Sequence, residues 1–308
     1  MREIDVSVVI VSHNTRDLLG NCIRSVQDKT FDISYEIIVV DNASGDGSPE
    51  LVKRDFPGVK LIANVGNLGF GKGNNLGMKE VSGKYYLLLN PDTVLMNNAI
   101  KIMYDFMEKE GVEKRIAVCG ASLFDEQDRP AVSFGRFPKP WSMIFYSLPF
   151  AVCFRRNGGI VPDFRRDYLF ADYVIGAAFF CRKDIVDELG MFDERYFAYY
   201  EETDLSKRIS LKGFRSAVLP SARIYHVGGQ SSQSSLFRKK VMYESSLYYL
   251  QKFHQNSVWF KSYCLVNELK YTVYRLFRPS IHKPFYDEMI AKTRLFRYQK
   301  RPPGNTSS

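Results

Sequence analysis

Carboxylate side chains stand directly after two apolar runs in this sequence. Asp41 follows Glu36 to Val40, and Asp92 follows the very apolar Tyr85 to Leu89 within Asn90-Pro91-Asp92-Thr93. A carboxylate just past a strand can accept hydrogen bonds from a nucleotide's base or ribose, so Asp41 is a candidate nucleotide ligand, with an Asx turn as the alternative. Asp92 suits Mg²⁺ or Mn²⁺, which prefer oxygen ligands and let phosphates complete the shell. Here the alternative is a turn capped by the aspartate.

A glycine-rich segment from Asn67 to Gly77 contains Gly71-Lys72-Gly73 at the opening of an expected helix. Glycines let the backbone approach a phosphate or ribose closely, and a helix N-terminus favours anions. A dinucleotide-binding enzyme would also use such a segment. Its fingerprint belongs directly after the first strand, however, where this chain has Ser12-His13-Asn14-Thr15.

Acidic residues also gather among aromatic ones between Phe192 and Leu205, where Glu201 and Glu202 are adjacent. They could simply complement the dipole of a helix that starts there. Paired carboxylates in apolar surroundings also make a general base, because burial and a like charge raise one pKa toward neutrality. His226 precedes Gly228-Gly229 at the end of an expected strand and is available to a metal, although a lone histidine is more often structural.

The elements that must position these residues follow a β-α-β pattern up to about residue 120. Strands are expected at Val6 to Val11, Ile37 to Val40, Val59 to Ile62 and Tyr85 to Leu89, with helical spacing between them. This alternation predicts an α/β fold with a mainly parallel sheet, helices on both faces and ligands at the carboxyl ends of the strands.

The later part of the chain is patterned less evenly. No clear periodicity runs from about Leu123 to Ala171, and signals resume with a strand at Tyr173 to Arg182 and helices at Asp184 to Leu189 and Glu202 to Lys212. After about Leu236 the chain reads as helical, aromatic and basic.

Composition narrows the classes of protein. With 308 residues, 45% hydrophobic and 25% charged, the chain is neither disordered nor fibrous. The net charge of +9 points to an anionic partner, which could be nucleic acid, an anionic lipid surface or a phosphorylated small molecule. Nucleic acid is disfavoured, because there is no recognisable binding motif and Lys and Arg look spread along the chain. The run Arg238-Lys239-Lys240 could bind phosphates or a membrane surface. Alternatively, it could simply be a solvent-exposed face.

The N-terminus lacks the apolar stretch of a signal peptide, so a cytosolic location is expected. Five dispersed cysteines without a C-x-x-C pair argue against a disulfide framework and a zinc site. No segment approaches the ~20 apolar residues of a membrane-spanning helix. The nearest, Met143 to Phe154, is flanked by Lys139, Arg155 and Arg156, which suits a segment lying in a membrane interface or, alternatively, a buried loop or helix.

Taken in order, the candidate segments resemble the family 2 glycosyltransferases of GT-A fold, in particular the rhamnosyltransferase-like branch that builds bacterial cell-surface polysaccharides. The likeness covers about Val6 to Ser232. Its most specific parts are Val8-Val9-Ile10-Val11-Ser12-His13-Asn14, Val39-Val40-Asp41-Asn42-Ala43-Ser44, Asn67-Leu68-Gly69-Phe70, Leu89-Asn90-Pro91-Asp92, Gly176-Ala177-Ala178-Phe179-Phe180 and Phe192-Asp193-Glu194 through Leu205.

The resemblance implies a GT-A catalytic domain over residues 1–235, with a Rossmann-like nucleotide-sugar-binding half at 1–120 and an acceptor-binding half at 121–235. A helical, basic and aromatic extension is predicted at 236–300, and a disordered tail at 301–308. Implied nucleotide ligands, among which Asp41 would hold the pyrimidine base, are Val11, Ser12, Asn14, Asp41, Asn67, Gly69, Asn74 and Asn90.

Glu202 sits where the family places its catalytic base, and Gly176, Ala177 and Glu201 are implied at the acceptor. Asp92 would bind Mg²⁺ or Mn²⁺ with help from His226. The chain departs from the pattern at Asn90, where many members have the first acid of a D-x-D motif, and at Glu202, where many have Asp.

The implied reaction is a single displacement that inverts the anomeric centre, with a nucleotide diphosphate sugar as donor and a glycan or lipid-linked hydroxyl as acceptor. The branch favours deoxythymidine diphosphate rhamnose, with uridine diphosphate hexoses next. The protein is then expected at the inner face of the cell membrane, on an anionic surface. A catalytically silent nucleotide-sugar-binding scaffold is the alternative, and a homo-oligomer is left open.

Overall fold

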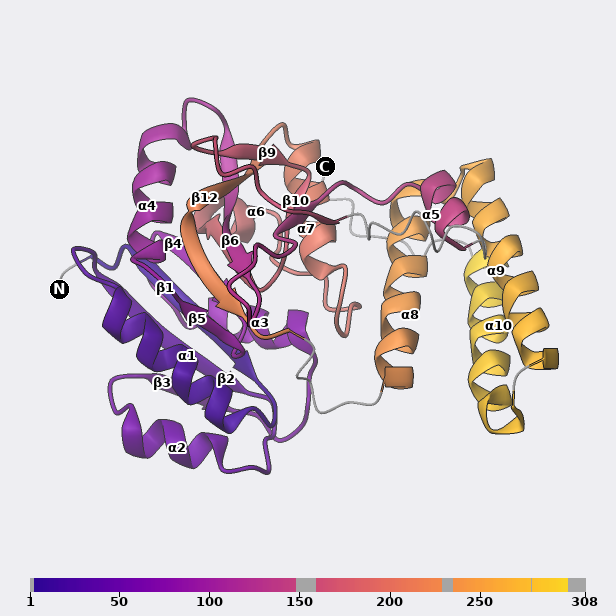
Figure 1. Cartoon of the computed structure of the whole chain (residues 1–308), viewed down its shortest axis with the longest axis horizontal. Coiled ribbons are helices and arrows are strands. Elements are labelled where there is room, and N and C mark those ends of the chain that lie inside the picture. Colours follow the sequence, from indigo (N-terminus) through magenta and orange to yellow (C-terminus); the bar gives the residue numbers. More distant parts are fainter. Residues whose placement is uncertain (1–2, 148–158, 229–234, 278, 299–308) are drawn as a thin grey trace. The chain divides into compact units, whose positions relative to one another are not determined.

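The structure, a computed structural model, describes residues 3–147, 159–228, 235–277 and 279–298. The chain forms two compact units. The first, an α/β unit, comprises Met1–Phe137 and Gly159–Ser232, and the second, a helical unit, comprises Pro138–Gly158 and Gln233–Ser308. Figure 1 shows the elements of both units.

A nine-stranded sheet is the centre of the α/β unit, in the order β3-β2-β1-β4-β11-β6-β12-β5, with β9 paired to β12. It is parallel from β3 to β4, whereas β11 runs antiparallel to both β4 and β6. The strands are β1 (Val6–Ser12), β2 (Tyr35–Asp41), β3 (Lys60–Ala63), β4 (Tyr85–Leu89), β5 (Thr93–Leu95), β6 (Ile116–Phe124), β9 (Leu169–Ala171), β11 (Ala178–Arg182) and β12 (Arg215–His226). A small second sheet joins β10 (Tyr173–Val174), β7 (Phe134–Gly135) and β8 (Gly159–Ile160).

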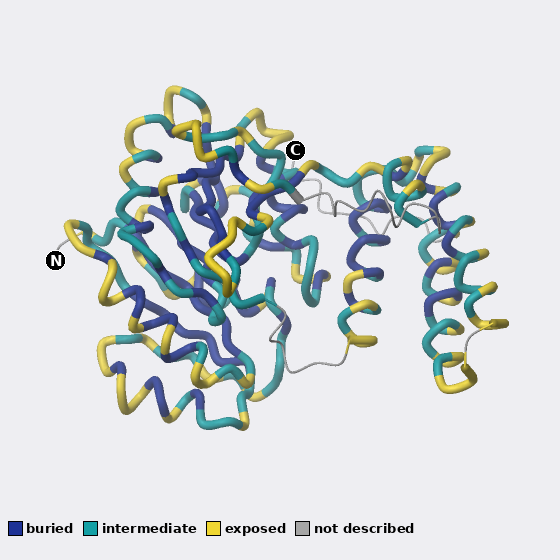
Figure 2. Tube along the Cα trace, viewed as in Figure 1, coloured by how far each residue is buried: buried dark blue, intermediate teal, exposed yellow. Residues whose placement is uncertain are grey.

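Helices cover both faces of the large sheet, because its strands are apolar on both sides. Along β1, Val8 and Ile10 join one core, and Val9 and Val11 join the other. On the first face, the core also includes residues of α1 (Arg16–Lys29), α2 (Ser48–Asp55) and α4 (Ala99–Glu110). On the second face, it includes residues of α3 (Phe70–Met78), α6 (Lys183–Glu188) and α7 (Glu201–Leu211). Figure 2 shows the buried strands between these layers. The predicted α/β fold with helices on both faces is confirmed.

Two strands differ from the sequence prediction. The expected strand from Tyr173 to Arg182 is split into β10 and β11, because Ala178 N donates to Ile175 O at 3.4 Å and turns the chain between them. β12 begins at Arg215 and continues past Pro220, because its register against β6 shifts between Leu219 and Arg223. Such an irregularity tolerates a proline, which has no N–H for the ladder.

The helical unit contains α5 (Pro140–Ser147), α8 (Ser235–His254), α9 (Val258–Phe277) and α10 (Lys283–Tyr298), with a single 3₁₀ turn at Ser280–His282. α9 packs against α5, α8 and α10. The helices expected after Leu236 are confirmed, but the unit also takes in Pro138–Gly158, which the sequence division placed in the acceptor-binding half. Most of the stretch from Met143 to Phe154 and the tail at 301–308 lie outside the described residues.

No helix in the described ranges is both long and apolar enough to cross a membrane. Four of the five cysteines are described, and each is buried and free, whereas Cys153 lies outside those ranges. Burial raises the pKa of the Cys22 thiol to about 12, so it stays protonated. Its Sγ lies 3.5 Å from the Asn90 carbonyl oxygen, which it supports at the end of β4.

Candidate active site

The carboxyl ends of β1 and β2 place Ser12 beside Asp41 in the parallel ladder. Asp41 is buried, and its Oδ2 accepts a hydrogen bond from Ser44 N at 2.9 Å, which closes the turn that the sequence offered as an alternative. The other carboxylate oxygen, Oδ1, is equally buried and has no partner in the described part of the chain. Asp41 therefore holds its turn with one oxygen, and its binding of a nucleotide through the other stays a prediction.

Asn14 ties the loop after β1 to the loop after β2. It adopts a left-handed φ of +53°, which asparagine tolerates better than most residues. Its backbone N–H donates to Ser44 Oγ at 2.9 Å, and its Oδ1 accepts from Gly45 N at 2.8 Å. Asn14 thus shapes the edge of the expected nucleotide pocket, and its contact with a nucleotide stays a prediction.

At Gly69 the glycine-rich segment packs tightly against the backbone of the acidic segment. The φ of Gly69 is +82°, and an added Cβ would lie 2.3 Å from the Phe197 carbonyl oxygen. That same oxygen accepts a hydrogen bond from Phe70 N at 2.7 Å. Only glycine fits both the backbone conformation and the contact. Asn67 supports it, because Asn67 Oδ1 accepts from Gly69 N at 2.9 Å.

Two neighbouring asparagines in α3 have different roles. Asn75 is fully paired with the backbone of Phe192, donating to its carbonyl at 2.9 Å and accepting from its N–H at 3.0 Å. It fixes the acidic segment against α3, a positioning role that the sequence did not reveal. Asn74 donates to Phe70 O at 3.0 Å, but its buried Oδ1 has no partner among the described residues. Asn74 therefore keeps an acceptor available.

The carboxylate pair opens α7 under backbone strain. Tyr199 and Tyr200, directly before it, have φ values of +66° and +71°, a region that costs bulky residues about 1–3 kcal/mol each. Burial raises the pKa of Glu202 to about 7. Burial, and then the charge of Glu202, hold the pKa of Glu201 well above its usual range. One oxygen of each carboxyl is buried and unpaired within the described residues.

Glu202 faces the acceptor-side turn that was predicted to lie with it. An added Cβ at Gly176 would stand 3.8 Å from Glu202 Cβ and Cγ and 3.7 Å from the Phe70 ring. The next residue, Ala177, accepts a hydrogen bond from Asn90 N at 3.0 Å. The turn between β10 and β11 thus joins the carboxylate pair to the end of β4, where the buried Oδ1 of Asn90 also has no described partner.

Asp92 and His226 meet although 134 positions separate them in the sequence, because β5 pairs with β12 and sets His226 opposite Thr93. Asp92 Oδ1 lies 3.3 Å from His226 Nε2. Neighbouring donors in an octahedral Mg²⁺ or Mn²⁺ shell are about 3 Å apart, so the pair fits two positions of one ion. No group of three or more His, Cys, Asp or Glu suited to a metal occurs among the described residues. The pair would therefore need oxygens from elsewhere, such as a diphosphate.

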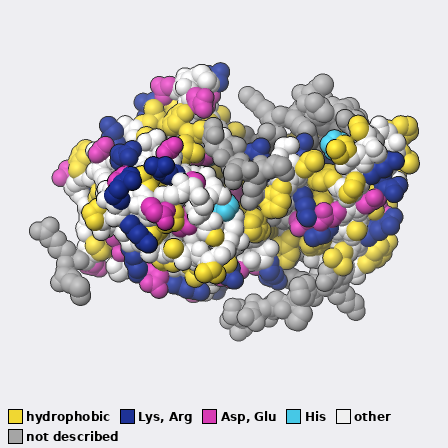
Figure 3. All heavy atoms as spheres, turned by 90° about the horizontal axis from the view of Figure 1, so that it is seen from below, with side chains coloured by type: hydrophobic (Ala, Val, Ile, Leu, Met, Phe, Trp, Pro, Cys, Tyr) yellow, Lys and Arg dark blue, Asp and Glu magenta, His cyan; other side chains and the backbone are white. Residues whose placement is uncertain are grey.

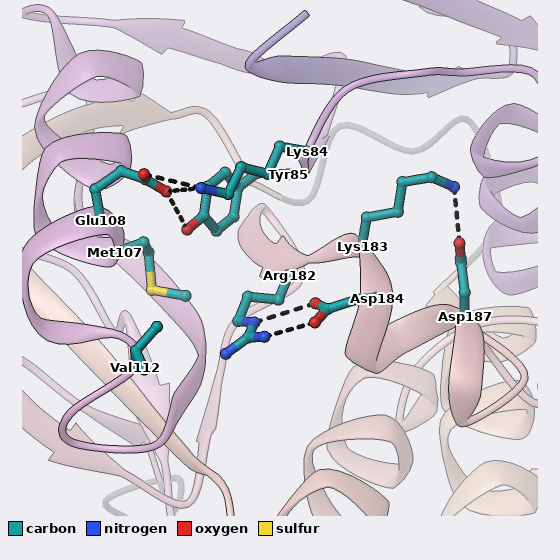
Figure 4. A pocket seen from close by; sticks show the side chains of 9 residues that line it. All are labelled: Lys84, Tyr85, Met107, Glu108, Val112, Arg182, Lys183, Asp184 and Asp187. Carbon is teal, nitrogen blue, oxygen red and sulfur yellow. Dashed lines mark hydrogen bonds and ion pairs between the residues drawn. The ribbon is translucent and has the colours of Figure 1, made fainter.

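A pocket on another side of the α/β unit does not compete with this cluster. It has a volume of about 450 Å³ and lies beside Tyr85, Glu108 and Arg182 (Figure 4). Tyr85 and Arg182 pair across the ladder at the opposite end of β4 from Asn90. The charged groups drawn there are engaged with one another, as in the ion pairs of Arg182 with Asp184 and of Lys183 with Asp187. The pocket contains none of the predicted site residues.

The chain has the GT-A fold that the sequence predicted. The structure of GalNAc-T7 with UDP, GalNAc and Mn²⁺ matches it with a TM-score of 0.62 at 16% identity, over 96% of this chain and 56% of that chain. The chain belongs to glycosyl transferase family 2, whose family model matches residues 7–189.

Two curated relatives are rhamnosyltransferases. One is the N-acetylglucosaminyl-diphospho-decaprenol L-rhamnosyltransferase of Mycobacterium tuberculosis, 24% identical over 62% of this chain. The match spans 66% of that relative, just under two thirds of its length. The other is rhamnosyltransferase WbbL of Escherichia coli K12, 25% identical over 74% of this chain and 86% of the relative.

Proposed function

We propose that this protein is a glycosyltransferase that inverts the anomeric centre of a nucleotide diphosphate sugar and transfers the sugar to a hydroxyl group, with Glu202 as the general base. The observation that carries this proposal is the setting of Glu202. Its side chain is half-buried, its carboxyl has a pKa of about 7 and one buried, unpaired oxygen, and it lies beside the Gly176 turn. A carboxyl with a pKa near the working pH is partly ionised yet still basic enough to take a proton.

In the proposed reaction, Glu202 accepts the proton of the acceptor hydroxyl while the oxygen of that hydroxyl attacks the anomeric carbon. The bond from that carbon to the diphosphate breaks in the same step, so no covalent enzyme intermediate is needed. Burial and the charge of an ionised Glu202 hold the pKa of Glu201 well above its usual range, so the pair is proposed to carry a single negative charge. Its protonated carboxyl can donate a hydrogen bond to an acceptor hydroxyl.

The nucleotide is proposed to bind along the ends of β1, β2 and β4. The unpaired Asp41 Oδ1 suits the imide N–H of uracil or thymine, and Asn74 and Asn90 offer acceptors for ribose or sugar hydroxyls. A buried acceptor without a donor costs free energy, which a bound nucleotide would relieve. A divalent ion held by Asp92 and His226 would offset the charge that grows on the leaving diphosphate.

For the donor sugar, the names of the two relatives support rhamnose, and the resemblance of the sequence to the rhamnosyltransferase-like branch favours deoxythymidine diphosphate as its carrier. The name of the mycobacterial relative supports a lipid-linked diphosphate sugar as acceptor. A thermal-shift screen separates the donor candidates, because a bound donor stabilises the folded state by mass action. We expect the deoxythymidine diphosphate rhamnose shift to exceed that of uridine diphosphate hexoses, and to grow with Mn²⁺. A larger shift with a uridine diphosphate hexose would move the assignment to that donor.

The base is tested with Glu202→Gln, which keeps the shape of the side chain but cannot take a proton. We expect transfer to fall by about 10²- to 10⁴-fold. Donor affinity in calorimetry should stay within a factor of about three, because Glu202 is proposed to act on the acceptor. The matched control is Glu188→Gln, whose side chain is 64% exposed, and it should transfer normally. Unchanged turnover in Glu202→Gln would contradict the assignment of Glu202 as the general base.

A further inference from the structure

Helix α9 in the helical unit is apolar on two opposite faces. One face is buried in the unit and includes Phe260, Tyr263 and Cys264. The other is exposed and carries an apolar stripe formed by Val258, Leu265, Leu269, Val273 and Leu276. The spacings of seven, four, four and three residues keep these side chains on one side of the helix. Leu269 and Leu276 are each 65% exposed, so the described chain leaves the stripe uncovered.

Both tryptophans of the protein are exposed on this unit. Trp141 in α5 is 55% exposed, and Trp259 in α9 is 53% exposed. Tryptophan is a large side chain with an apolar ring and one polar N–H, which suits the boundary between lipid and water. Trp259 adjoins the apolar stripe directly, since it follows Val258, and large exposed apolar side chains that gather on one unit mark an interaction surface.

The positive charge of the protein is concentrated in the same unit. Residues 138–158 and 233–308 hold 17 Lys and Arg against 4 Asp and Glu, a net +13, whereas the other residues hold 26 against 30, a net −4. Lys and Arg themselves are spread along the chain, as the sequence indicated, and the surplus arises because Asp and Glu are scarce in this unit. Figure 3 shows hydrophobic and basic side chains next to one another on this unit.

The acidic residues of the helical unit do not offset this charge at its surface, because each is paired within the unit. Glu244 pairs with Lys292, and Glu288 pairs with Lys240. Glu268 binds Arg294 and Arg297, and Asp287 binds Arg275. The surplus cations include Lys261 in α9 and Lys283 in α10, both of which are exposed.

We infer that the helical unit docks on an anionic lipid surface through the apolar stripe of α9. An interfacial helix buries its apolar face at the boundary of headgroups and acyl chains, while nearby Lys and Arg attract anionic headgroups. Nucleic acid would match the charge but would leave the apolar stripe without a partner. The inference is independent of the proposed reaction, since it concerns residues outside the candidate active site.

Vesicle flotation of the full chain tests the inference without donor or acceptor. We expect the protein to float with vesicles of phosphatidylcholine and phosphatidylglycerol and to stay behind with phosphatidylcholine alone. Its tryptophan emission should shift to shorter wavelength on binding, because both tryptophans lie in the docking unit. The triple variant Leu265→Gln/Leu269→Gln/Leu276→Gln should lower the vesicle partition coefficient by at least about tenfold.

The matched control is Val112→Gln, which changes an apolar side chain of the α/β unit that is 75% exposed and should float normally. Circular dichroism and donor-induced thermal shifts show that each variant is folded. Failure of the unaltered protein to float overturns the inference. Equal flotation of the triple variant overturns the role of the stripe and leaves charge alone as the cause. A dimer without vesicles that becomes a monomer in the triple variant would assign the stripe to a second copy of the chain.

Discussion

At the scale of single residues, Glu201 and Glu202 place two carboxyl groups in one water-poor environment, where ionising both is costly. With the pKa of Glu202 raised to about 7, the base is mostly protonated at pH 5 and mostly ionised at pH 8. Only the ionised form can accept a proton. We therefore expect kcat/KM for the acceptor to rise by about tenfold per pH unit below pH 7 and to level off above it. A profile that is flat from pH 5 to pH 8 would contradict this assignment.

Asp92 gives a second prediction at this scale. Asp92→Ala removes the only carboxylate of the proposed two-residue metal site, so the Mn²⁺-dependent part of donor binding should largely disappear. Loss of a residue that only hydrogen-bonds to a metal ligand already lowers metal affinity by about 10- to 100-fold. Because Asp92 is proposed as a ligand itself, we expect its removal to lower metal affinity by at least about tenfold. Calorimetry with and without Mn²⁺ measures it. Asp105→Ala, in which an exposed acid of α4 is removed, serves as control. Metal-dependent affinity that persists in Asp92→Ala would refute the site.

The sequence indicated Asp41, Asp92 and Glu202 because each follows or opens a well-patterned element. It could not show that Asp41 divides its two oxygens between a turn and an open position, since this depends on a single hydrogen bond from Ser44. Nor could spacing show that Asp92 and His226 lie 3.3 Å apart. That distance follows from the pairing of β5 with β12, a contact between distant parts of the chain.

At the scale of elements, one guanidinium ties α7 to the chain just before the acidic segment. Arg208 donates to Asp204 Oδ1 at 2.7 Å, to Leu189 O at 2.7 Å and to Met191 O at 2.6 Å. The Asp204 side chain is fully buried and also accepts from Tyr196 OH at 3.2 Å. These bonds connect the helix that carries the carboxylate pair to the segment that leads into it. Arg208 is thus a positioning residue for Glu202.

Arg208→Met should destabilise the protein by about 3–5 kcal/mol, because it leaves the buried Asp204 carboxylate without its cation. Urea unfolding would show a lower midpoint with an unchanged slope. The control is Lys101→Met, which breaks an exposed pair of the same four-residue spacing with Asp105 and should cost less than about 1 kcal/mol. Similar losses in the two variants would contradict the special role of Arg208.

Elements were predicted accurately where apolar runs are continuous and bounded by polar residues or glycines. The apolar strands β1, β2 and β4 and the glycine-rich start of α3 were all placed correctly to within one or two residues. The stretch from about Leu123 to Ala171 could not be predicted, because its two-residue strands β7 and β8 are too short to show a period. The Asp204–Arg208 spacing was visible, but the bonds of Arg208 to Leu189 and Met191 are set by tertiary packing.

At the scale of the whole molecule, the net charge of the sequence is that of a moderately basic protein. The two units, however, have net charges of opposite sign. The α/β unit carries a net −4 and the helical unit a net +13. Gln233–Ser308 alone holds 14 Lys and Arg against 4 Asp and Glu, a net +10, and Pro138–Gly158, which belongs to the same unit, adds three cations and no acid. The composition alone could therefore indicate an anionic partner but not where it binds.

The final prediction concerns how salt acts on each unit. With a lipid-linked acceptor in anionic vesicles, the apparent KM should rise by at least about fivefold between about 0.05 and 0.5 M NaCl, because salt screens the attraction of the helical unit to the surface. With a water-soluble acceptor, the KM should change little, because Glu201 is buried and Glu202 half-buried, so salt screens them far less than exposed charges. Kinetics with both acceptors on the same preparation measure the difference. Equal salt dependence for both would show that the charge acts at the active site, and not through docking of the helical unit.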